Sequence, residues 1–211
     1  WYVAMNWHDY QHQLWRIVRI DEGGLVFYGG FFGAALAMIW WSRRFRLSIP
    51  VVADLSAVAL PMGHAFGRVG CLMNGCCFGR PTTLPFGIIY DREGFPGVWD
   101  TQVQQGLIHG GNVSSLMDPI TNHVHCLPVF PVQAALGLGN LLVAGVLLGV
   151  APRLRTPGRL FTLFLVLYPL NRFCWEFLRG DYPSRPGGLT PAQWVSLVVL
   201  PVGLIWFIAL G

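Results

Sequence analysis

The chain has 211 residues, of which 54% are hydrophobic and only 11% are charged, and its mean hydropathy is +0.50. Because an ordinary soluble domain has about 25% charged residues, this composition excludes a typical soluble enzyme, and the high hydrophobicity excludes intrinsic disorder. The net charge of +4 is the difference between 14 basic and 10 acidic residues, and every basic residue is arginine because the chain has no lysine. These arginines are scattered between apolar runs and form no basic face of the kind that binds nucleic acid, so we expect no nucleic-acid partner.

Five apolar segments follow one another along the chain, and each is close to the ~20 residues that a helix needs to cross a bilayer. They cover residues 25–42, 50–66, 132–151, 160–177 and 191–210. The second segment is short and carries Asp54 and His64. The sequence therefore predicts an all-α, polytopic integral membrane protein with about five transmembrane helices in a single membrane domain, surrounded by membrane lipids.

Two short loops rich in arginine set the expected orientation. One follows the first segment and the other joins the third to the fourth; their arginines are Arg43, Arg44, Arg46, Arg153, Arg155 and Arg159. Because short Arg-rich loops stay in the cytoplasm, we place residues 80–131 and 179–190 outside and the C-terminus inside. Residues 80–131 are too many for a simple connection, so we expect a mixed extracytoplasmic insertion with some structure of its own.

The segment over residues 67–81, GRVGCLMNGCCFGRP, is rich in glycine and carries arginine. It makes a poor lipid-facing helix, and non-helical backbone at membrane depth is tolerated only where it lines a cavity or is buried in protein. An arginine at this depth costs about 2.5–3.5 kcal/mol on insertion scales and usually marks a site. Arg68 beside the backbone amides of a Gly-rich loop would suit a phosphate. The alternative is that Arg68 merely extends its charged head to the interface.

A second polar group lies in the fourth segment, YPLNRFCWEFLRGD. Tyr168, Arg172 and Glu176 are spaced four residues apart, so they share one face of a helix. Arg172 and Glu176 can pair directly, which lowers the cost of burying either, and Arg179 continues near that face. The alternative is a structural ion pair that fixes this helix to a neighbour.

The cysteines and histidines offer a weaker case for a metal site. Cys71, Cys76, Cys77 and His64 are four candidate ligands, but their spacing matches no common zinc pattern, and adjacent cysteines rarely serve one tetrahedral site. We interpret the thiols as small buried groups and expect no metal and no cofactor. Asp54 faces either a cavity or a partner arginine, and the sequence leaves both open.

Three of these segments, in chain order, resemble the motifs of the prolipoprotein diacylglyceryl transferase family. GRVGCLMNGCCFGR is similar to the family pattern G-R-x-G-x-x-x-N-G-x-x-x-G, EGGLVFYGGFFGA resembles its glycine-rich first motif, and YPLNRFCWEFLR resembles its late Tyr/Arg/Glu motif. The resemblance covers about residues 20–210. Together the motifs are specific, although none would be so alone.

The resemblance implies a transferase of the bacterial inner membrane that catalyses the first step of lipoprotein maturation. Such an enzyme moves the diacylglyceryl group of phosphatidylglycerol to the thiol of a prolipoprotein lipobox cysteine and releases glycerol phosphate. We hypothesise that Arg68 and Arg172 hold the phosphoryl group while Glu176 orients Arg172. By resemblance the catalytic residues are Arg68, Tyr168, Arg172, Glu176 and Tyr28, and the substrate-binding residues are Arg68, Asn74, Gly79, Gly29, Gly30 and Arg179.

The chain also departs from the family pattern. Tyr28 stands where many members have His, Cys71 replaces a frequent Asn, and the usual His-Pro-x-Gln-Leu-Tyr-Glu is FPVQAAL here, which keeps only Pro131 and Gln133. Members normally have two further spans before the first motif. Because the chain begins with Trp1 and shows no signal peptide, we expect a truncated or divergent member. Two other functions therefore stay open: a catalytically weakened homologue that binds phospholipid or prolipoprotein, and a small membrane transporter.

Overall fold

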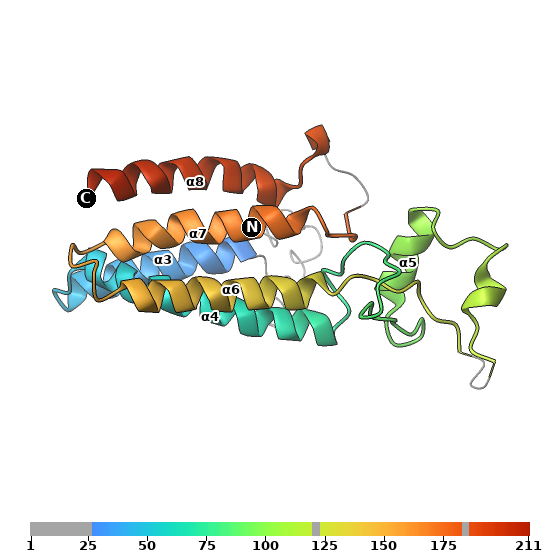
Figure 1. Ribbon diagram of the computed structural model, residues 1–211. Coiled ribbons are helices and arrows are strands. Elements are labelled where there is room, and N and C mark those ends of the chain that lie inside the picture. Colours follow the sequence, from blue (N-terminus) through green and yellow to red (C-terminus); the bar gives the residue numbers. More distant parts are fainter. Residues whose placement is uncertain (1–26, 120–122, 183–185) are drawn as a thin grey trace. The chain divides into compact units, whose positions relative to one another are not determined.

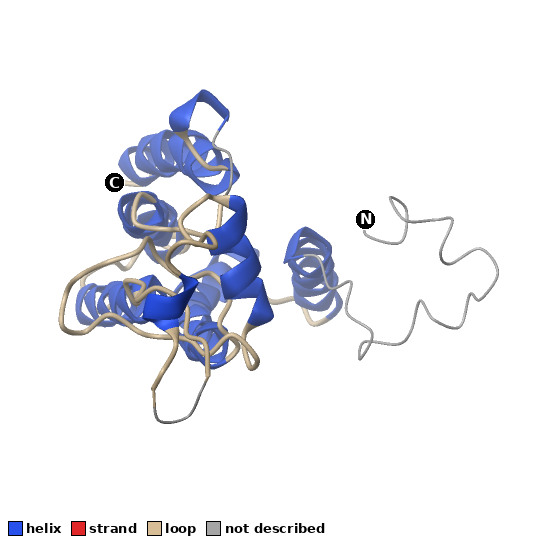
Figure 2. Cartoon of the chain, turned by 90° about the vertical axis from the view of Figure 1, so that its right-hand side faces the viewer, coloured by secondary structure: helices blue, strands red, loops and turns tan. Residues whose placement is uncertain are grey.

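The computed structural model describes residues 27–119, 123–182 and 186–211, and the regular secondary structure of these residues is helical, as predicted. They form six α-helices and two short 3₁₀ turns (Figure 1). The rest of the described chain is loop with isolated β-bridges and no strand (Figure 2). The chain divides into two compact units, Trp1–Val52 and Ala53–Gly211.

The first unit contains helix α3, Phe27–Arg44. Arg43 and Arg44 lie in its last turn, where cations interact favourably with the negative end of the helix dipole. The helix ends as Leu47 N–H donates to Ser42 O at 2.8 Å, with Arg46 in the left-handed region at φ 53°. The start of the predicted segment 25–42 falls outside the described residues.

Four long helices of the chain supply the bundle of the second unit. They are α4, Ile49–Met73, which begins in the first unit; α6, Val132–Val150; α7, Arg159–Glu176; and α8, Pro191–Ala209. Helix α7 packs against both α6 and α8 (Figure 1). Ala57, Val143, Leu147, Leu160 and Phe164 form the buried apolar cluster between α4, α6 and α7.

Close contact between helices depends on small residues, because lipid tails are as apolar as leucine and give helices no hydrophobic reason to associate. A Cβ added to Gly203 of α8 would lie 2.8–2.9 Å from Leu165 of α7, including its backbone carbonyl. A Cβ at Gly139 of α6 would lie 2.1 Å from Asn171 Oδ1. Asn171 instead donates to Asn140 Oδ1 at 3.1 Å, so the small residue leaves room for a polar contact between α6 and α7.

The structure gives Asp54 a role that its sequence position leaves open, because its carboxylate binds backbone N–H groups at the start of α7. Its two carboxylate oxygens accept hydrogen bonds from Gly158 N–H at 2.7 Å and Phe161 N–H at 2.8 Å. Helix α7 has no side-chain cap of its own, since its N-cap residue is Gly158 at φ 90°. A carboxylate from α4 therefore satisfies the first free N–H groups of α7 and complements its dipole.

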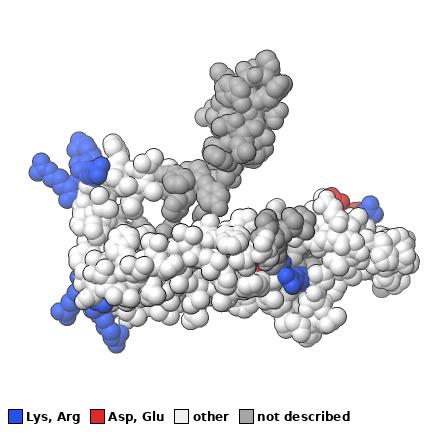
Figure 3. All heavy atoms as spheres, turned by 90° about the horizontal axis from the view of Figure 1, so that it is seen from above, with Lys and Arg blue, Asp and Glu red and all other residues white. Residues whose placement is uncertain are grey.

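Within the described residues, three helices are long and apolar enough to cross a membrane by length and composition: α4, α6 and α8. Helices α3 and α7 have 18 residues each, and α7 includes three charged residues, Arg159, Arg172 and Glu176. On the face seen in Figure 3, the atoms over the long helices are neither basic nor acidic, and charged side chains lie near helix ends. The length and composition of these helices support an all-α membrane protein.

The glycine-rich segment 67–81 corrects one prediction, because its first half is not irregular backbone. Helix α4 continues to Met73, so Arg68 lies on a helix and not in a glycine loop. A helix satisfies its own backbone N–H and C=O groups, which outweighs the weak helix propensity of Gly67 and Gly70. Irregular backbone begins at Asn74, and Gly75 adopts φ 64° against the ring of Phe95.

The insertion over residues 80–131 has structure of its own, as predicted. It contains α5, Pro96–Gln104, and the 3₁₀ turn η3, Val113–Leu116. Gln102, fully buried, donates to Leu127 O at 3.0 Å and accepts from Leu127 N–H at 2.9 Å, which mimics one rung of a sheet. The buried core of this part consists of Phe78, Tyr90, Val98, Trp99, Ile108, Cys126 and Val129.

Candidate active site

The C-terminal end of α7 carries the ion pair that the sequence predicts. Arg172 Nη2 lies 3.1 Å from Glu176 Oε2, and the two side chains are 14% and 0% exposed. A carboxylate with no solvent contact needs cationic or hydrogen-bonding partners, because burying it alone is costly. The four-residue spacing on one helix supplies the first of these partners.

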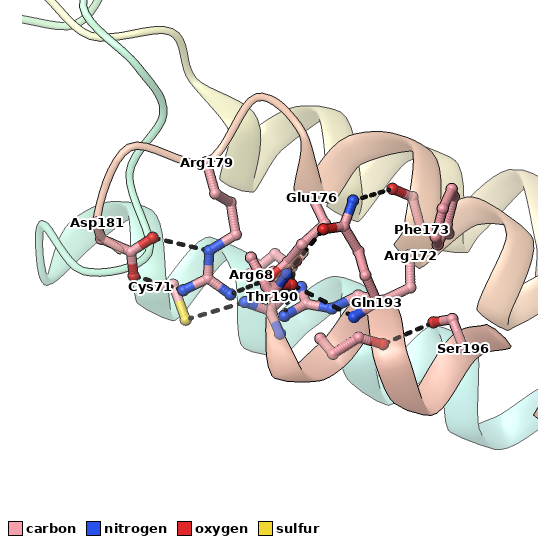
Figure 4. Close-up of polar contacts among 11 residues, drawn as sticks. Arg68, Cys71, Arg172, Phe173, Glu176, Arg179, Asp181, Thr190, Gln193 and Ser196 are labelled. Carbon is pink, nitrogen blue, oxygen red and sulfur yellow. Dashed lines mark hydrogen bonds and ion pairs between the residues drawn. The ribbon is translucent and has the colours of Figure 1, made fainter. Parts of the chain in front are cut away.

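The second partner of Glu176 comes from beyond the end of the helix. Arg179 Nη1 lies 3.4 Å from Glu176 Oε1, its Nε donates to Asp181 Oδ1 at 2.8 Å, and its Nη2 pairs with Asp181 Oδ2 (Figure 4). We call Arg172, Glu176, Arg179 and Asp181 the charge network. Burial disfavours the charge on Arg179, but Asp181 and Glu176 prevail and raise the pKa of its guanidinium. Arg179 therefore stays a cation.

Backbone contacts join this network to the glycine-rich segment. Gly79 and Arg179 form an antiparallel bridge, Arg80 N–H donates to Leu178 O at 2.9 Å, and Gly180 N–H donates to Phe78 O at 2.9 Å. A Cβ at Gly180 would lie 2.3 Å from Gly79 O, so only glycine permits this crossing. The two polar segments that the sequence singles out are therefore neighbours in the fold.

Arg68 extends from α4 toward the same region (Figure 4). Its Nη1 lies 3.9 Å from Cys71 Sγ, and it is close enough to Arg172 to repel it electrostatically. Tyr168, one helical turn before Arg172, stacks on the ring of His64 at 5.1 Å and on the ring of Phe164 at 5.3 Å between centroids. The structure thus brings together Arg68, Tyr168, Arg172, Glu176 and Arg179.

One donor in this group has no acceptor. Arg172 Nη1 is buried and makes no hydrogen bond to any described residue. Buried N–H groups are nearly always paired, and leaving a charged one unpaired costs more than an ordinary desolvation penalty of about 1–3 kcal/mol. A guanidinium with a free N–H among other cations is suited to an anionic oxygen such as that of a phosphate.

The remaining residues predicted from the sequence lie just after α4 and at the start of α3. Asn74 is exposed at the end of α4. Gly79 packs on the backbone of Phe130, where a Cβ would lie 2.3 Å from Phe130 O, so its geometry explains a structural need for glycine. Tyr28, Gly29 and Gly30 lie at the start of α3 in the unit Trp1–Val52. Their role in the site stays a prediction.

Sequence reasoning missed two residues that support the site. Gln133 is fully buried at the start of α6, and its Nε2 donates to Cys76 O at 3.0 Å and lies 3.4 Å from the Tyr90 hydroxyl. Burial raises the pKa of Tyr90, which keeps its hydroxyl protonated to donate to Leu72 O at 3.2 Å. The persistence of Gln133 in the otherwise altered FPVQAAL segment was the available signal. Asp181 carried no such signal.

Comparison with known proteins identifies the family of this chain. The sequence profile described as prolipoprotein diacylglyceryl transferase matches residues 1–209. The phosphatidylglycerol--prolipoprotein diacylglyceryl transferase of Clostridium tetani is 27% identical over 91% of this chain and 66% of its own length. The enzymes of the same name from Thermosynechococcus vestitus and Xylella fastidiosa strain 9a5c are 32% and 31% identical, over 96% and 95% of this chain. In both cases 67% of the relative is covered, so the chain spans about two thirds of the length of these relatives. With a match over almost its whole length, the chain belongs to the prolipoprotein diacylglyceryl transferase family.

Proposed function

We propose that this protein transfers the diacylglyceryl group of phosphatidylglycerol to the lipobox cysteine thiol of a prolipoprotein in the bacterial inner membrane. The names of its relatives support this substrate pair. The observation that carries the proposal is the buried Nη1 of Arg172, which has no hydrogen-bond partner among the described residues and lies in a group of cations at the end of an apolar bundle. A phosphodiester headgroup attached to lipid chains matches both properties.

The reaction forms one bond and breaks one bond. The sulfur of the thiol attacks the glycerol carbon that bears the phosphate, a carbon–sulfur bond forms, and the carbon–oxygen bond to phosphate breaks. The bond electrons leave with the phosphate oxygen as glycerol phosphate, and the thiol proton passes to a base or to solvent. Negative charge therefore gathers on the leaving group, and fixed cations stabilise that charge more in the transition state than in the ground state.

Arg172 and Arg68 are the groups placed to bind this phosphate. Glu176 holds Arg172 through Nη2 at 3.1 Å, which leaves Nη1 to the substrate. Arg68 approaches from the neighbouring helix α4 with only a weak contact to Cys71 Sγ at 3.9 Å. In contrast, Arg179 is committed to Asp181 and Glu176, so we assign it a positioning role rather than contact with the phosphate.

A transfer assay on the purified chain with phosphatidylglycerol and a lipobox peptide tests this proposal. Wild-type protein should add a diacylglyceryl group to the peptide, seen as a mass increase. Arg172→Gln should lower the rate by about 10²–10³-fold, the effect of removing one donor to developing charge. Arg155→Gln, in the exposed loop between α6 and α7, is the matched control and should change the rate less than twofold.

A weakened homologue that binds lipid without transfer is the second candidate. It is favoured by the FPVQAAL segment, in which Phe130 packs against Phe86 at 5.9 Å between ring centroids where the family resemblance implies histidine. No transfer by wild-type protein, together with saturable phosphatidylglycerol binding that Arg68→Gln abolishes, would support this candidate. Transfer by Arg172→Gln at the wild-type rate would refute the assignment of Arg172.

A further inference from the structure

A chain reversal after α4 brings three cysteine side chains together. Cys71 lies in the last turn of the helix, and Cys76 and Cys77 follow the turn. The three sulfur atoms all lie within 4.8 Å of one another. We call these residues the three-thiol cluster. The spacing of these cysteines in the sequence matches no common metal-binding motif. Their sulfur atoms come together because of how the backbone folds after α4.

The turn is held in place by specific contacts. Cys76 N–H donates to Cys71 O at 3.1 Å, and Cys76 O accepts from Gln133 Nε2 at 3.0 Å. Cys77 adopts φ 58°, a left-handed conformation that is uncommon for residues other than glycine and costs of the order of 1–3 kcal/mol. Adjacent side chains in extended backbone point to opposite sides. The unusual conformation of Cys77 explains how neighbouring sulfurs come to lie in one group.

Two guanidinium groups lie close to the three-thiol cluster. Arg68 Nη1 lies 3.9 Å from Cys71 Sγ (Figure 4), and Cys77 interacts electrostatically with Arg179. Three thiolates around a divalent cation carry a net charge of minus one, and nearby guanidinium groups offset that charge. All three cysteines are partly accessible, so a metal ion can reach them from solution.

We propose that the three-thiol cluster binds a soft, thiophilic metal cation, such as Cu⁺, Zn²⁺ or Cd²⁺, through three sulfurs. A zinc–thiolate bond of about 2.3 Å places three coordinating sulfurs about 4 Å apart, so small side-chain movements suffice here. Thiolates select soft cations over Mg²⁺ and Ca²⁺, which prefer oxygen ligands. The convergence of three thiols, and not two, favours a metal over a disulfide.

The test uses the full chain in detergent, reduced and then freed of reductant and metal, with Cd²⁺ as the probe. Thiolate-to-metal charge-transfer absorption should saturate at one Cd²⁺ per chain. Cys71→Ser, Cys76→Ser and Cys77→Ser should each weaken binding by about 100-fold, at least as much as the loss of an outer ligand contact. Cys174→Ser, on the exposed side of α7, should leave the affinity within twofold of wild type.

A second measurement on wild-type protein does not depend on how the variants fold. Alkylation with iodoacetamide, followed by mass spectrometry of peptides, should show that Cd²⁺ protects Cys71, Cys76 and Cys77 and leaves Cys174 reactive. The proposal is overturned if Cd²⁺ protects none of the three, or if the reduced protein gives no charge-transfer signal. A disulfide that reforms within the cluster in the presence of excess Cd²⁺ would also contradict it.

Discussion

The arginines of this protein have different roles because their hydrogen-bond and ion-pair partners differ. Arg179 pairs with two carboxylates. Arg172 pairs with one carboxylate, and its buried Nη1 has no acceptor in the part of the chain that the structure describes. Arg155 lies in an exposed loop. The charge of an arginine is constant under physiological conditions, so the number of hydrogen bonds left open by the protein determines which of them is suited to bind a phosphate.

Glu176 is the single residue on which the charge network depends most. We expect Glu176→Gln to lower the free energy of unfolding by about 3–5 kcal/mol, because it leaves Arg172 and Arg179 close together without their shared carboxylate. Glu93→Gln is the matched control, since the Glu93 side chain is 78% exposed and exposed substitutions usually change stability by less than 0.5 kcal/mol. Unfolding in mixed detergent micelles measures both. Equal stability of the two variants would contradict a supporting role for Glu176.

The helices are joined by polar contacts at their ends and by small residues along their length. At the N-terminus of α8, Thr190 and Gln193 form a capping box, and Gln193 Nε2 also donates to Phe173 O of α7 at 3.3 Å. Gly203 permits the close approach of α8 to α7 farther along. The same two helices are thus aligned by a cap at one end and by close packing in the middle.

The cap of α7 by Asp54 gives a prediction at the scale of elements. Asp54→Ala removes acceptors from two N–H groups and should lower the free energy of unfolding by about 1–2 kcal/mol, the usual cost of losing a helix cap. Asp54→Asn keeps one carbonyl acceptor and should cost less. Asp100→Ala, at an exposed position of α5, is the control. The cap is disproved as a source of stability if both alanine variants unfold alike.

Two Arg-rich loops give a prediction at the scale of the whole molecule. Because short Arg-rich loops stay in the cytoplasm, we expect the loops after α3 and after α6 to lie inside and residues 80–131 to lie outside the membrane. Alkaline phosphatase fused after residue 111 should therefore be active in cells, whereas the same reporter fused after residue 156 should be inactive. A cytoplasmic fluorescent reporter at the same two positions is the complementary control and should give the opposite pattern. Activity at residue 156 alone would require the reverse orientation.

Much of this architecture follows from local sequence. Hydrophobic runs of helical length predict the long helices because apolar composition and length are sufficient for that inference. The four-residue spacing predicts the Arg172–Glu176 pair, which forms at 3.1 Å. Local reasoning failed at residues 67–73, where glycine content suggested irregular backbone. The helix persists there because its internal hydrogen bonds matter more in an apolar environment than glycine's propensity.

The sequence by itself therefore determined the membrane class, the helical segments and the pairing within α7, because each depends on residues a few positions apart. Only the tertiary structure decided which groups complete the site. Asp54 meets Phe161 across 107 positions and Gln133 meets Cys76 across 57, while the turn at Gly75 gathers three thiols. The contacts of Asp54 and Gln133 arise when packed helices and crossing loops bring distant backbone together, and no local pattern of residues specifies them.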